Sequence, residues 1–471
     1  MTWKWFFILF FSILAESFHV QESIAQERKW FGKSVDFSHG RLIVSENQRF
    51  LIFEDGTPFF WLGDTAWELF HRLTKNEAER YLENRREKGF TVIQAVILAE
   101  LDGLNVPNAE GEKPLIDQDP TRINENYFKH VDWVINKAEE KGMFIGLLPT
   151  WGDKVDKRWG IGPVIFNPEN AETYGEFLGK RYKDVKNIIW INGGDRPVTE
   201  HTIPVWRALA KGIRKHDQNH LMTYHPNGAH SSSQWFHHED WLDFNMIQTS
   251  HHERSYAAFI KLLIPDYHLK PVKPTLDGEP RYEHFPVNWD PELFGRFDDA
   301  DVRQAAYWAV FTGAFGHTYG CHSVWQMNAP GREPVRHALH SWYDDLDLPG
   351  AWDMLHVRKL MESRPFIDRI PFQQIVKNEY FPETDYIIAT RGKDYVMVYI
   401  PTGKGAKLAL SLCGWPTTNV WWYNCKTGQA THLSKISTDQ VKYFEPKTRG
   451  RGNDWVLILD NAARSFGPPG E

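Results

Sequence analysis

The sequence predicts an α/β protein, with a (β/α)8 barrel followed by a smaller antiparallel β-sandwich. Eight extended segments, most of them followed by helical patterns, lie between residues 58 and 362, as expected when helices connect parallel strands. An open, doubly wound sheet would give the same alternation, but no glycine-rich phosphate turn follows the first strand, which favours the barrel. After Pro365 helical periodicity stops and short strands separated by turns follow, which is typical of a sandwich.

The chain divides into three predicted parts. Residues 1–26 contain Lys4, a short apolar stretch and small residues at Ser23 and Ala25, a pattern typical of a secretory signal peptide. A retained membrane anchor is the alternative, which the shortness of the apolar stretch disfavours. Residues 27–370 form the predicted barrel with a short lead-in, and residues 371–471 form the sandwich. We therefore expect a secreted or periplasmic protein.

Composition limits the possible partners. With 42% hydrophobic and 24% charged residues among 471, the chain can bury a sizeable core. A net charge of -7 without a long basic block argues against nucleic acid as a partner. The 21 tryptophans favour carbohydrate, because flat aromatic faces stack on sugar rings, although many can serve core packing. The oligomeric state stays open.

Only three cysteines occur, so disulfides do not hold this chain together. Cys413 and Cys425 could pair within the C-terminal part, which would leave Cys321 as a buried free thiol.

The barrel strands are extended runs that end in polar residues or glycine. Those runs cover residues 58–63, 90–98, 143–151, 187–194, 220–224, 243–248, 273–278 and 317–325. The sandwich strands are predicted at residues 386–390, 395–400, 407–412, 419–423 and 455–459.

Capping residues mark several helix starts. Thr74 and Glu77 form a capping box, and Asn167 followed by Pro168 opens another helix. Before the barrel, the Asp-Gly pair at 55–56 predicts a hairpin turn. The predicted helices cover residues 74–88, 124–141, 167–182, 203–215, 254–267, 298–314 and 351–362.

Two strand ends carry the candidate catalytic acids. The run 188–191 lacks alternation, as in a strand covered on both faces, and ends in two glycines and Asp195. The strand at 273–278 likewise ends in a glycine before Glu279. These are the fourth and seventh barrel strands, whose carboxyl ends face each other across the mouth where barrel active sites lie. For one such acid, a helix cap would be the simpler interpretation.

Two facing acids fit the hydrolysis of a glycosidic bond. One acid protonates the leaving oxygen, and a carboxylate meets the positive charge that develops at the anomeric carbon. We assign Asp195 as general acid/base and Glu279 as nucleophile, a retaining scheme that requires about 5–5.5 Å between the groups. The sequence does not fix these roles, and an inverting scheme would place the acids about 6.5–9.5 Å apart.

Polar and aromatic residues near the other strand ends are candidates for substrate binding. Amide and imidazole groups exchange hydrogen bonds with hydroxyls, and tryptophan stacks on rings. Arg196 and Arg281 follow the two acids closely and could bind the carboxylate of an acidic sugar or instead orient the acids through ion pairs. Any one histidine or tryptophan could be a core residue, and Asp277 is expected deeper, as support. The candidates are Asp64, Trp67, Gln94, Trp151, Asn192, His225, Gln248, His251, Arg281, His317 and Trp325.

No metal or cofactor is expected from the motifs. The first barrel strand ends without the His-x-His of barrel metallohydrolases, and the histidine pairs at 237–238 and 251–252 lack ligand spacing. No Gly-x-Ser-x-Gly elbow for a serine nucleophile occurs either.

Three motifs carry a family resemblance. PFFWLGDTAW at 58–67, WINGGD at 190–195 and DGEP at 277–280 make residues 35–465 similar to the apiosidase-like glycoside hydrolases of family 140. The resemblance implies a (β/α)8 barrel with a small β-domain and cleavage of apiosyl linkages in the pectic polysaccharide rhamnogalacturonan II. It also places the family's catalytic aspartate and glutamate on Asp195 and Glu279.

Several other functions remain open at this point. The chain could be a glycosidase of different sugar specificity, a non-catalytic carbohydrate-binding protein, or an adhesin that acts through its C-terminal domain. The collagen-binding label of the family's β-domain has no support in these residues. We expect the tail to serve as a structural cap on the barrel.

Overall fold

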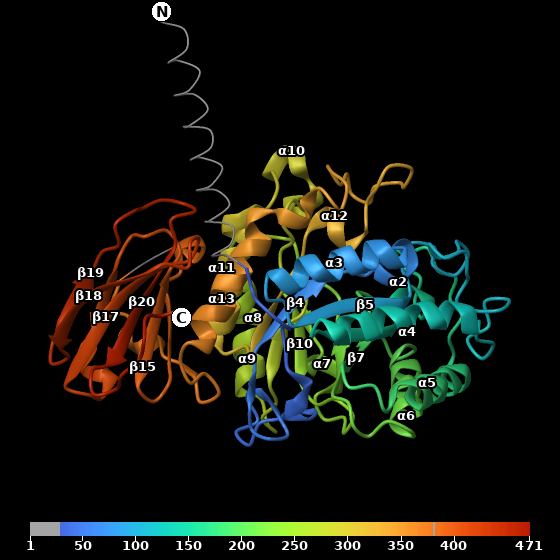
Figure 1. Cartoon of the computed structure of the whole chain (residues 1–471), viewed down its shortest axis with the longest axis horizontal. Helices are drawn as coiled ribbons and strands as arrows, with labels where there is room; N and C mark the ends of the chain where they lie inside the picture. The colour runs from blue at the N-terminus through green and yellow to red at the C-terminus, as the bar shows by residue number, and fades with distance from the viewer. Residues whose placement is uncertain (1–28, 380–381) are drawn as a thin grey trace, which may run out of the picture.

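A nearly closed barrel of eight parallel strands dominates the structure, a computed structural model that describes residues 29–379 and 382–471. The predicted signal peptide at 1–26 lies outside these residues. Strand β4 pairs in parallel with both β5 and β12, so the sheet curls around (Figure 1). The predicted fold is confirmed. The parallel strands are β4 (Trp61–Thr65), β5 (Val92–Leu98), β6 (Phe144–Thr150), β7 (Ile188–Gly193), β8 (Met222–His225), β10 (Asn245–Gln248), β11 (Thr275–Asp277) and β12 (Gly316–Tyr319).

The barrel closes between β8 and β10 without a regular ladder. Beyond β10 the sheet adds only the short antiparallel strand β9 (His230–Ser231). Across the seam, the Asp243 backbone N–H donates to the Met222 carbonyl at 2.8 Å. The Thr223 hydroxyl donates to the Phe244 carbonyl at 2.6 Å. Together with the Met222 backbone N–H, which donates to Asp243 Oδ2 at 2.7 Å, these bonds join the two strands where regular pairing is missing.

Helices surround the barrel, and their starts follow the capping residues. Thr74, Asn167 and Asp298 each form a capping box. The stretch predicted as one helix at 254–267 is two short helices, with Leu262 at φ -114° between them. The helices are α2 (Leu69–Arg72), α3 (Lys75–Glu87), α4 (Glu125–Glu140), α5 (Pro168–Tyr182), α6 (Ile203–Arg214), α7 (Ser233–Phe236), α8 (Ala257–Lys261), α9 (Leu263–His268), α10 (Pro291–Phe294), α11 (Asp299–Thr312), α12 (His322–Trp325) and α13 (Pro349–Glu362).

The chain differs from a simple barrel before its first strand and after its last one. The lead-in forms the predicted hairpin, with β1 (Leu42–Val44) paired to β2 (Leu51–Phe53) and β2 to β3 (Pro58–Phe59) around Gly56. The eighth barrel strand is shorter than predicted, because the chain leaves the sheet at Gly320 and Trp325 lies on α12. Among the described residues, no helix is both long enough and apolar enough to cross a membrane bilayer.

The C-terminal part consists of two antiparallel sheets, as predicted. The larger has the order β13-β14-β15-β20-β17-β18, and β16 pairs with β19. The prediction omitted β18 and β19, because most residues of both are exposed or half-buried and their sequences show no apolar alternation. The strands are β13 (Ile370–Pro371), β14 (Ile388–Arg391), β15 (Tyr395–Ile400), β16 (Ala406–Ala409), β17 (Thr417–Asn424), β18 (Ala430–Ser437), β19 (Val441–Phe444) and β20 (Trp455–Asn461).

The larger sheet is buried on both faces at its centre. Val398 on β15 packs into the inner core of the sandwich, whereas Tyr399 belongs to a core shared with the barrel. The Tyr399 ring stacks on Tyr307 of α11 with centroids 4.8 Å apart. The sandwich therefore lies against α11 and α13 (Figure 1). The structural-cap role of the tail stays a prediction.

The cysteine pairing considered from the sequence is wrong. Cys413 and Cys425 are both buried and free, as is Cys321. Cys413 packs in the inner core of the sandwich, and Cys425 in the core shared with the barrel. The two thiols therefore belong to different cores of the C-terminal part.

A buried ionic cluster joins the two parts of the chain. Arg303 of α11 is fully buried and contacts Asp454 at 2.7 Å. Its Nη1 also lies 2.5 Å from Asp353 and 3.0 Å from Asp299. Removing the arginine would leave buried carboxylates without a compensating charge. We therefore expect Arg303 to contribute strongly to the stability of the contact between the barrel and the C-terminal part.

Replacing Arg303 by methionine is expected to lower the free energy of unfolding by about 3–5 kcal/mol. Urea unfolding followed by tryptophan fluorescence measures the loss. The matched control is Arg464→Met, which removes a half-exposed partner of Asp394 and is expected to cost about 0.2–1 kcal/mol. Equal effects of the two substitutions would contradict a special role for the buried cluster.

Candidate active site

Two glycines direct Asp195 into a cleft at the carboxyl ends of the strands. Strand β7 ends at Gly193 with φ 93°, followed by Gly194 with φ 129°. A side chain on Gly194 would lie 2.6 Å from the Gly152 backbone nitrogen, so the loops touch there. Asp195 itself has φ 49°, in the left-handed region. Its side chain is 26% exposed and receives bonds from Gln248 Nε2 at 3.3 Å and Trp159 Nε1 at 3.4 Å.

Glu279 lies on the floor of the same cleft, two residues beyond β11. Its side chain is only 8% exposed. His251 Nε2 lies 3.2 Å from Oε1, and His225 Nε2 lies 3.1 Å from Oε2. The two imidazoles thus hold the carboxylate from two sides.

The cleft has a volume of about 470 Å³ and is lined by both acids. Aromatic side chains form much of its wall, including Trp67, Trp151, Trp159, Tyr282, Phe285, Trp289 and Trp325. Amide, hydroxyl and imidazole groups of Gln248, Ser250, His251 and His252 lie between them. Flat aromatic faces combined with such polar groups are suited to sugar rings and their hydroxyls.

The two acids have opposite pKa shifts. Burial raises the pKa of Asp195, and the nearby Glu279 charge raises it further, against an opposing effect of Arg196. Burial alone would also raise the pKa of Glu279, but the hydrogen bonds and charges of His225 and His251 outweigh it and lower the pKa to about 2. The pair therefore favours a protonated Asp195 beside an ionised Glu279, the division of states that acid/base and nucleophilic roles require.

Five of the eleven predicted substrate-binding residues line the cleft: Trp67, Trp151, Gln248, His251 and Trp325. Three of these side chains come from loops after barrel strands, and Gln248 ends β10. Trp325 reaches the cleft from α12 rather than from a strand.

Three of the other candidates contact neighbouring residues of the barrel and do not line the cleft. Asp64 is fully buried and accepts bonds from Tyr81 Oη at 2.5 Å and Arg85 Nε at 2.6 Å. The expectation that it binds sugar is corrected, since β4 continues past it to Thr65 and its carboxylate reaches α3. Gln94 donates to the Gly278 carbonyl at 2.9 Å, and Asn192 packs its amide nitrogen 3.4 Å from Met222 Sδ.

The remaining three also lie outside the lining of the cleft. His225 is fully buried and edges against Trp67, so it acts on Glu279 rather than on a ligand. Arg281 donates to the Ser255 carbonyl at 2.9 Å and to Gln304 at 3.1 Å. His317 is 1% exposed, and burial lowers its pKa to about 3. Burial beneath the cleft keeps His225 and His317 from a ligand, and the Arg281 guanidinium is bonded to neighbouring residues.

Several residues of the cleft were not predicted. Glu100 follows β5 by two residues, as Asp195 follows β7. Acids just after barrel strands lie at the mouth, so Glu100 could have been found from the sequence. Arg196, considered from the sequence as a residue that could orient the acids, joins Glu100 to Asp195, with Nη2 at 3.3 Å from Glu100 and Nη1 at 3.5 Å from Asp195. Burial raises the pKa of Glu100 to about 7. No sequence signal marks Trp159, which comes from the long loop after β6.

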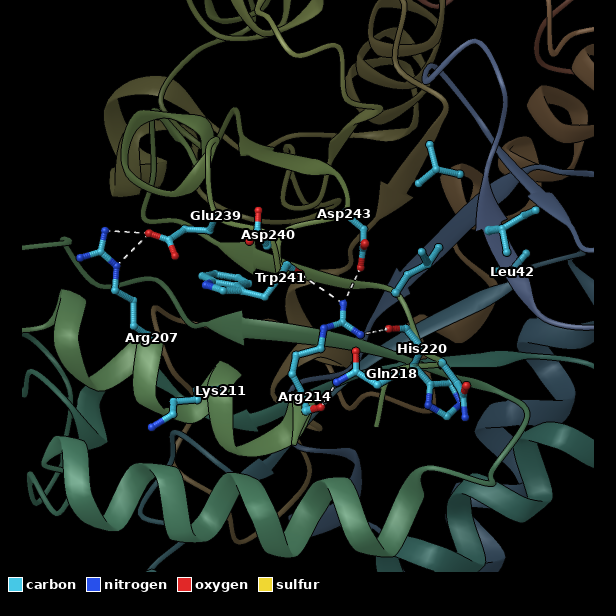
Figure 2. A pocket seen from close by; sticks show the side chains of 14 residues that line it. Leu42, Arg207, Lys211, Arg214, Gln218, His220, Glu239, Asp240, Trp241 and Asp243 are labelled. Carbon is cyan, nitrogen blue, oxygen red and sulfur yellow. Dashed lines mark hydrogen bonds and ion pairs between the residues drawn. The ribbon is translucent and has the colours of Figure 1, made fainter. Parts of the chain in front are cut away.

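A larger hollow of about 660 Å³ lies at the opposite, amino-terminal end of the barrel strands. Figure 2 shows Arg214 of α6 reaching both His220 and Asp243, and Arg207 reaching Glu239. Arg214 contacts Asp243 at 2.7 Å, next to the seam between β8 and β10. Both arginines of the hollow are paired with its acids, and this end of a barrel generally serves stability. The hollow is therefore not the candidate active site.

Comparisons with known proteins agree with this geometry. A family model described as "Apiosidase-like, catalytic domain" matches residues 45–368, and one described as "Putative collagen-binding domain of a collagenase" matches residues 370–460. A glycoside hydrolase family 5 structure from Bacteroides vulgatus is 34% identical with a TM-score of 0.86, covering 92% of this chain and 95% of that one.

A second solved structure, named simply a glycoside hydrolase, is 36% identical with a TM-score of 0.85, covering 92% of this chain and 100% of that one. The comparison with curated proteins gave no match. The similarity to both structures extends over the barrel and most of the C-terminal part.

Proposed function

The chain belongs to the apiosidase-like family of glycoside hydrolases, and from this membership we propose that it cleaves an apiosyl linkage of the pectic glycan rhamnogalacturonan II. The observation that carries the catalytic proposal is the pair of acids with opposite pKa shifts in one cleft. The proposed substrate rests on the family alone. A different sugar specificity is therefore the main alternative.

The proposed mechanism retains the configuration of the sugar. In the first step the Glu279 carboxylate attacks the anomeric carbon, while protonated Asp195 gives its proton to the departing glycosidic oxygen. A covalent ester between sugar and Glu279 results. In the second step Asp195, now ionised, removes a proton from water, which attacks the same carbon and releases Glu279.

Neighbouring residues support both steps. His225 and His251 keep Glu279 ionised before attack, and Gln248 and Trp159 orient Asp195. Because Glu279 ceases to be charged once the ester forms, the pKa of Asp195 falls at that stage. Asp195 can then act as a base in the second step.

Release of sugar from rhamnogalacturonan II tests the substrate. Purified protein is incubated with fragmented rhamnogalacturonan II, and the freed sugar is identified by chromatography and mass spectrometry. We expect apiose, or an oligosaccharide newly ended at the apiosyl linkage, with Glu279→Gln as the inactive control. Release of another sugar would overturn the apiosidase proposal and leave the hydrolase. Tight binding of glycan without any product would favour a binding protein.

The pH profile of kcat/KM should be broad on its acid side. Activity requires ionised Glu279 and protonated Asp195, so it falls as pH drops through the lowered pKa of Glu279 and as pH rises through the raised pKa of Asp195. His251→Gln removes one group that lowers the Glu279 pKa, and it should move the acid limb to higher pH. An unmoved acid limb would contradict the role of His251.

We propose further that the protein is exported with residues 1–26 as its signal peptide. The basis is the sequence pattern of Lys4 followed by a short apolar stretch. Amino-terminal sequencing of protein secreted by an expressing cell would test this, with a start close to residue 27 as the expected result. Retention of the full amino terminus in the membrane fraction would contradict it.

A further inference from the structure

We propose that His284, His340 and Asp345 bind one divalent transition-metal ion, with zinc as the preferred metal, and that this ion joins two loops at the rim of the cleft. Nothing in the proposed hydrolysis uses these three residues. They form a cluster of metal-ligating side chains outside the cleft.

The geometry of the three side chains fits a small metal site. Their ligand atoms all lie within 4.8 Å of one another. His340 Nδ1 lies 2.8 Å from Asp345 Oδ1, and His284 Nδ1 lies 3.6 Å from Asp345 Oδ2. Tetrahedral zinc with bonds of about 2.0–2.2 Å places its ligands roughly 3.3–3.6 Å apart. This spacing lies within the range from 2.8 Å to 4.8 Å that the ligand atoms of the cluster span. His340 is 50% exposed, so its ring can adjust and leave room for a water as fourth ligand.

The charge of Asp345 supplies an independent argument. Its side chain is only 3% exposed, and among the described residues its ion-pair partners are these two histidines alone. Arg296 donates instead to the carbonyls of His284 and His337. Buried carboxylates are normally paired with a cation or coordinate a metal, and neutral imidazoles supply no charge. A divalent ion would neutralise Asp345 and use both imidazoles.

A proton on His284 is the competing way to neutralise Asp345. The hydrogen bond and charge of Asp345 raise the pKa of His284 against the opposing effect of burial. The two interpretations differ in a measurable way, because a protonated histidine needs no metal. Ser323 donates to Asp345 Oδ2 at 2.7 Å and would orient the carboxylate in either case.

The position of the cluster gives the metal a defined role. His284 follows β11 in the loop that also brings Phe285 and Trp289 to the cleft, and its φ of 66° shows that the surrounding structure constrains it. His340 and Asp345 come from the loop between α12 and α13, which brings Val335 and Arg336 to the same cleft. An ion shared by the loops would fix this side of the rim.

Zinc titration of purified, untagged and chelator-treated protein tests the proposal. Calorimetry is expected to show one zinc per chain, and cobalt(II) should give the visible absorption bands of a tetrahedral site. Zinc should also raise the Tm, because it binds only the folded arrangement. His340→Gln changes a half-exposed side chain, so folding is preserved, and it should weaken zinc binding more than the roughly 10–100-fold that loss of an outer-sphere partner costs.

A matched control separates this cluster from adventitious binding by surface histidines. His238→Ala removes an exposed histidine next to His237, and zinc affinity and stoichiometry should stay unchanged. Asp345→Asn should abolish the site, as His340→Gln weakens it. Absence of zinc binding by the unaltered protein, or equal binding by the His340→Gln variant, would overturn the proposal and leave protonated His284 as the partner of Asp345.

Discussion

Glu279→Gln is expected to lower kcat for glycoside hydrolysis by on the order of 10⁴-fold or more, the scale seen when the nucleophile of a covalent mechanism is removed. Glutamine has nearly the shape of glutamate, but its amide cannot form the ester to the sugar. The loss should be the same for substrates with good and poor leaving groups. Initial rates on a releasable aryl glycoside and on the natural glycan measure it.

The control for this substitution is Glu292→Gln. Glu292 is exposed on α10, in the same loop region, and its replacement should leave the rate at the unaltered value. Circular dichroism of the Glu279→Gln variant checks that folding is intact. A variant that keeps more than about a tenth of the activity would remove Glu279 from the mechanism.

Asp195→Asn is expected to lower hydrolysis of the natural glycan by about 10²–10⁴-fold, the usual contribution of a general acid. Asparagine is suited to the position, because it tolerates the left-handed backbone that Asp195 adopts at φ 49°. The first step should survive on an aryl glycoside whose leaving group needs no proton. The second step should then limit the rate, and added azide, which needs no base, should accelerate turnover.

This dependence on the leaving group distinguishes a general acid from a residue that only shapes the site. Asp240→Asn, at an exposed position on the far end of the barrel, serves as the control with no expected change. Equal losses on both substrates, with no effect of azide, would contradict the acid/base assignment for Asp195.

The sequence predicted the barrel and the meeting of its two acids well, because both follow from local rules. Capping boxes at Thr74, Asn167 and Asp298 place helix starts, and the alternation of strands and helices implies a parallel sheet. The absence of a glycine-rich turn after the first strand then favours a closed barrel over an open sheet. In such a sheet the carboxyl ends share one rim. Asp195 and Glu279 therefore could be assigned to one cleft without any knowledge of distances.

Knowing that a residue lies at the rim of the barrel does not show in which direction its side chain points. Asp64 and Trp67 are three positions apart, yet the carboxylate reaches α3 while the indole lines the cleft. A residue one position deeper in a strand points to the opposite face, so a small error in a strand boundary changes its role. His225 illustrates a third outcome, since it is buried beneath the cleft and acts through Glu279.

Contacts between distant segments lay beyond the sequence pattern as well. The approach of His284 to Asp345 depends on how two loops fold, and neither residue belongs to a recognisable motif. Cys413 and Cys425 seemed close along the chain, but they belong to two different cores. Strand β18 lacks a buried face, so its position at the sheet edge depends on β17 alone.

The most direct test of the two-acid mechanism is to trap its covalent intermediate. The Asp195→Asn variant is mixed with an activated aryl glycoside, quenched in acid, digested and analysed by mass spectrometry. Our account predicts a sugar ester on the peptide that contains Glu279, accumulating within the first turnover. A sugar attached to a different residue, or product of inverted configuration without any adduct, would contradict it.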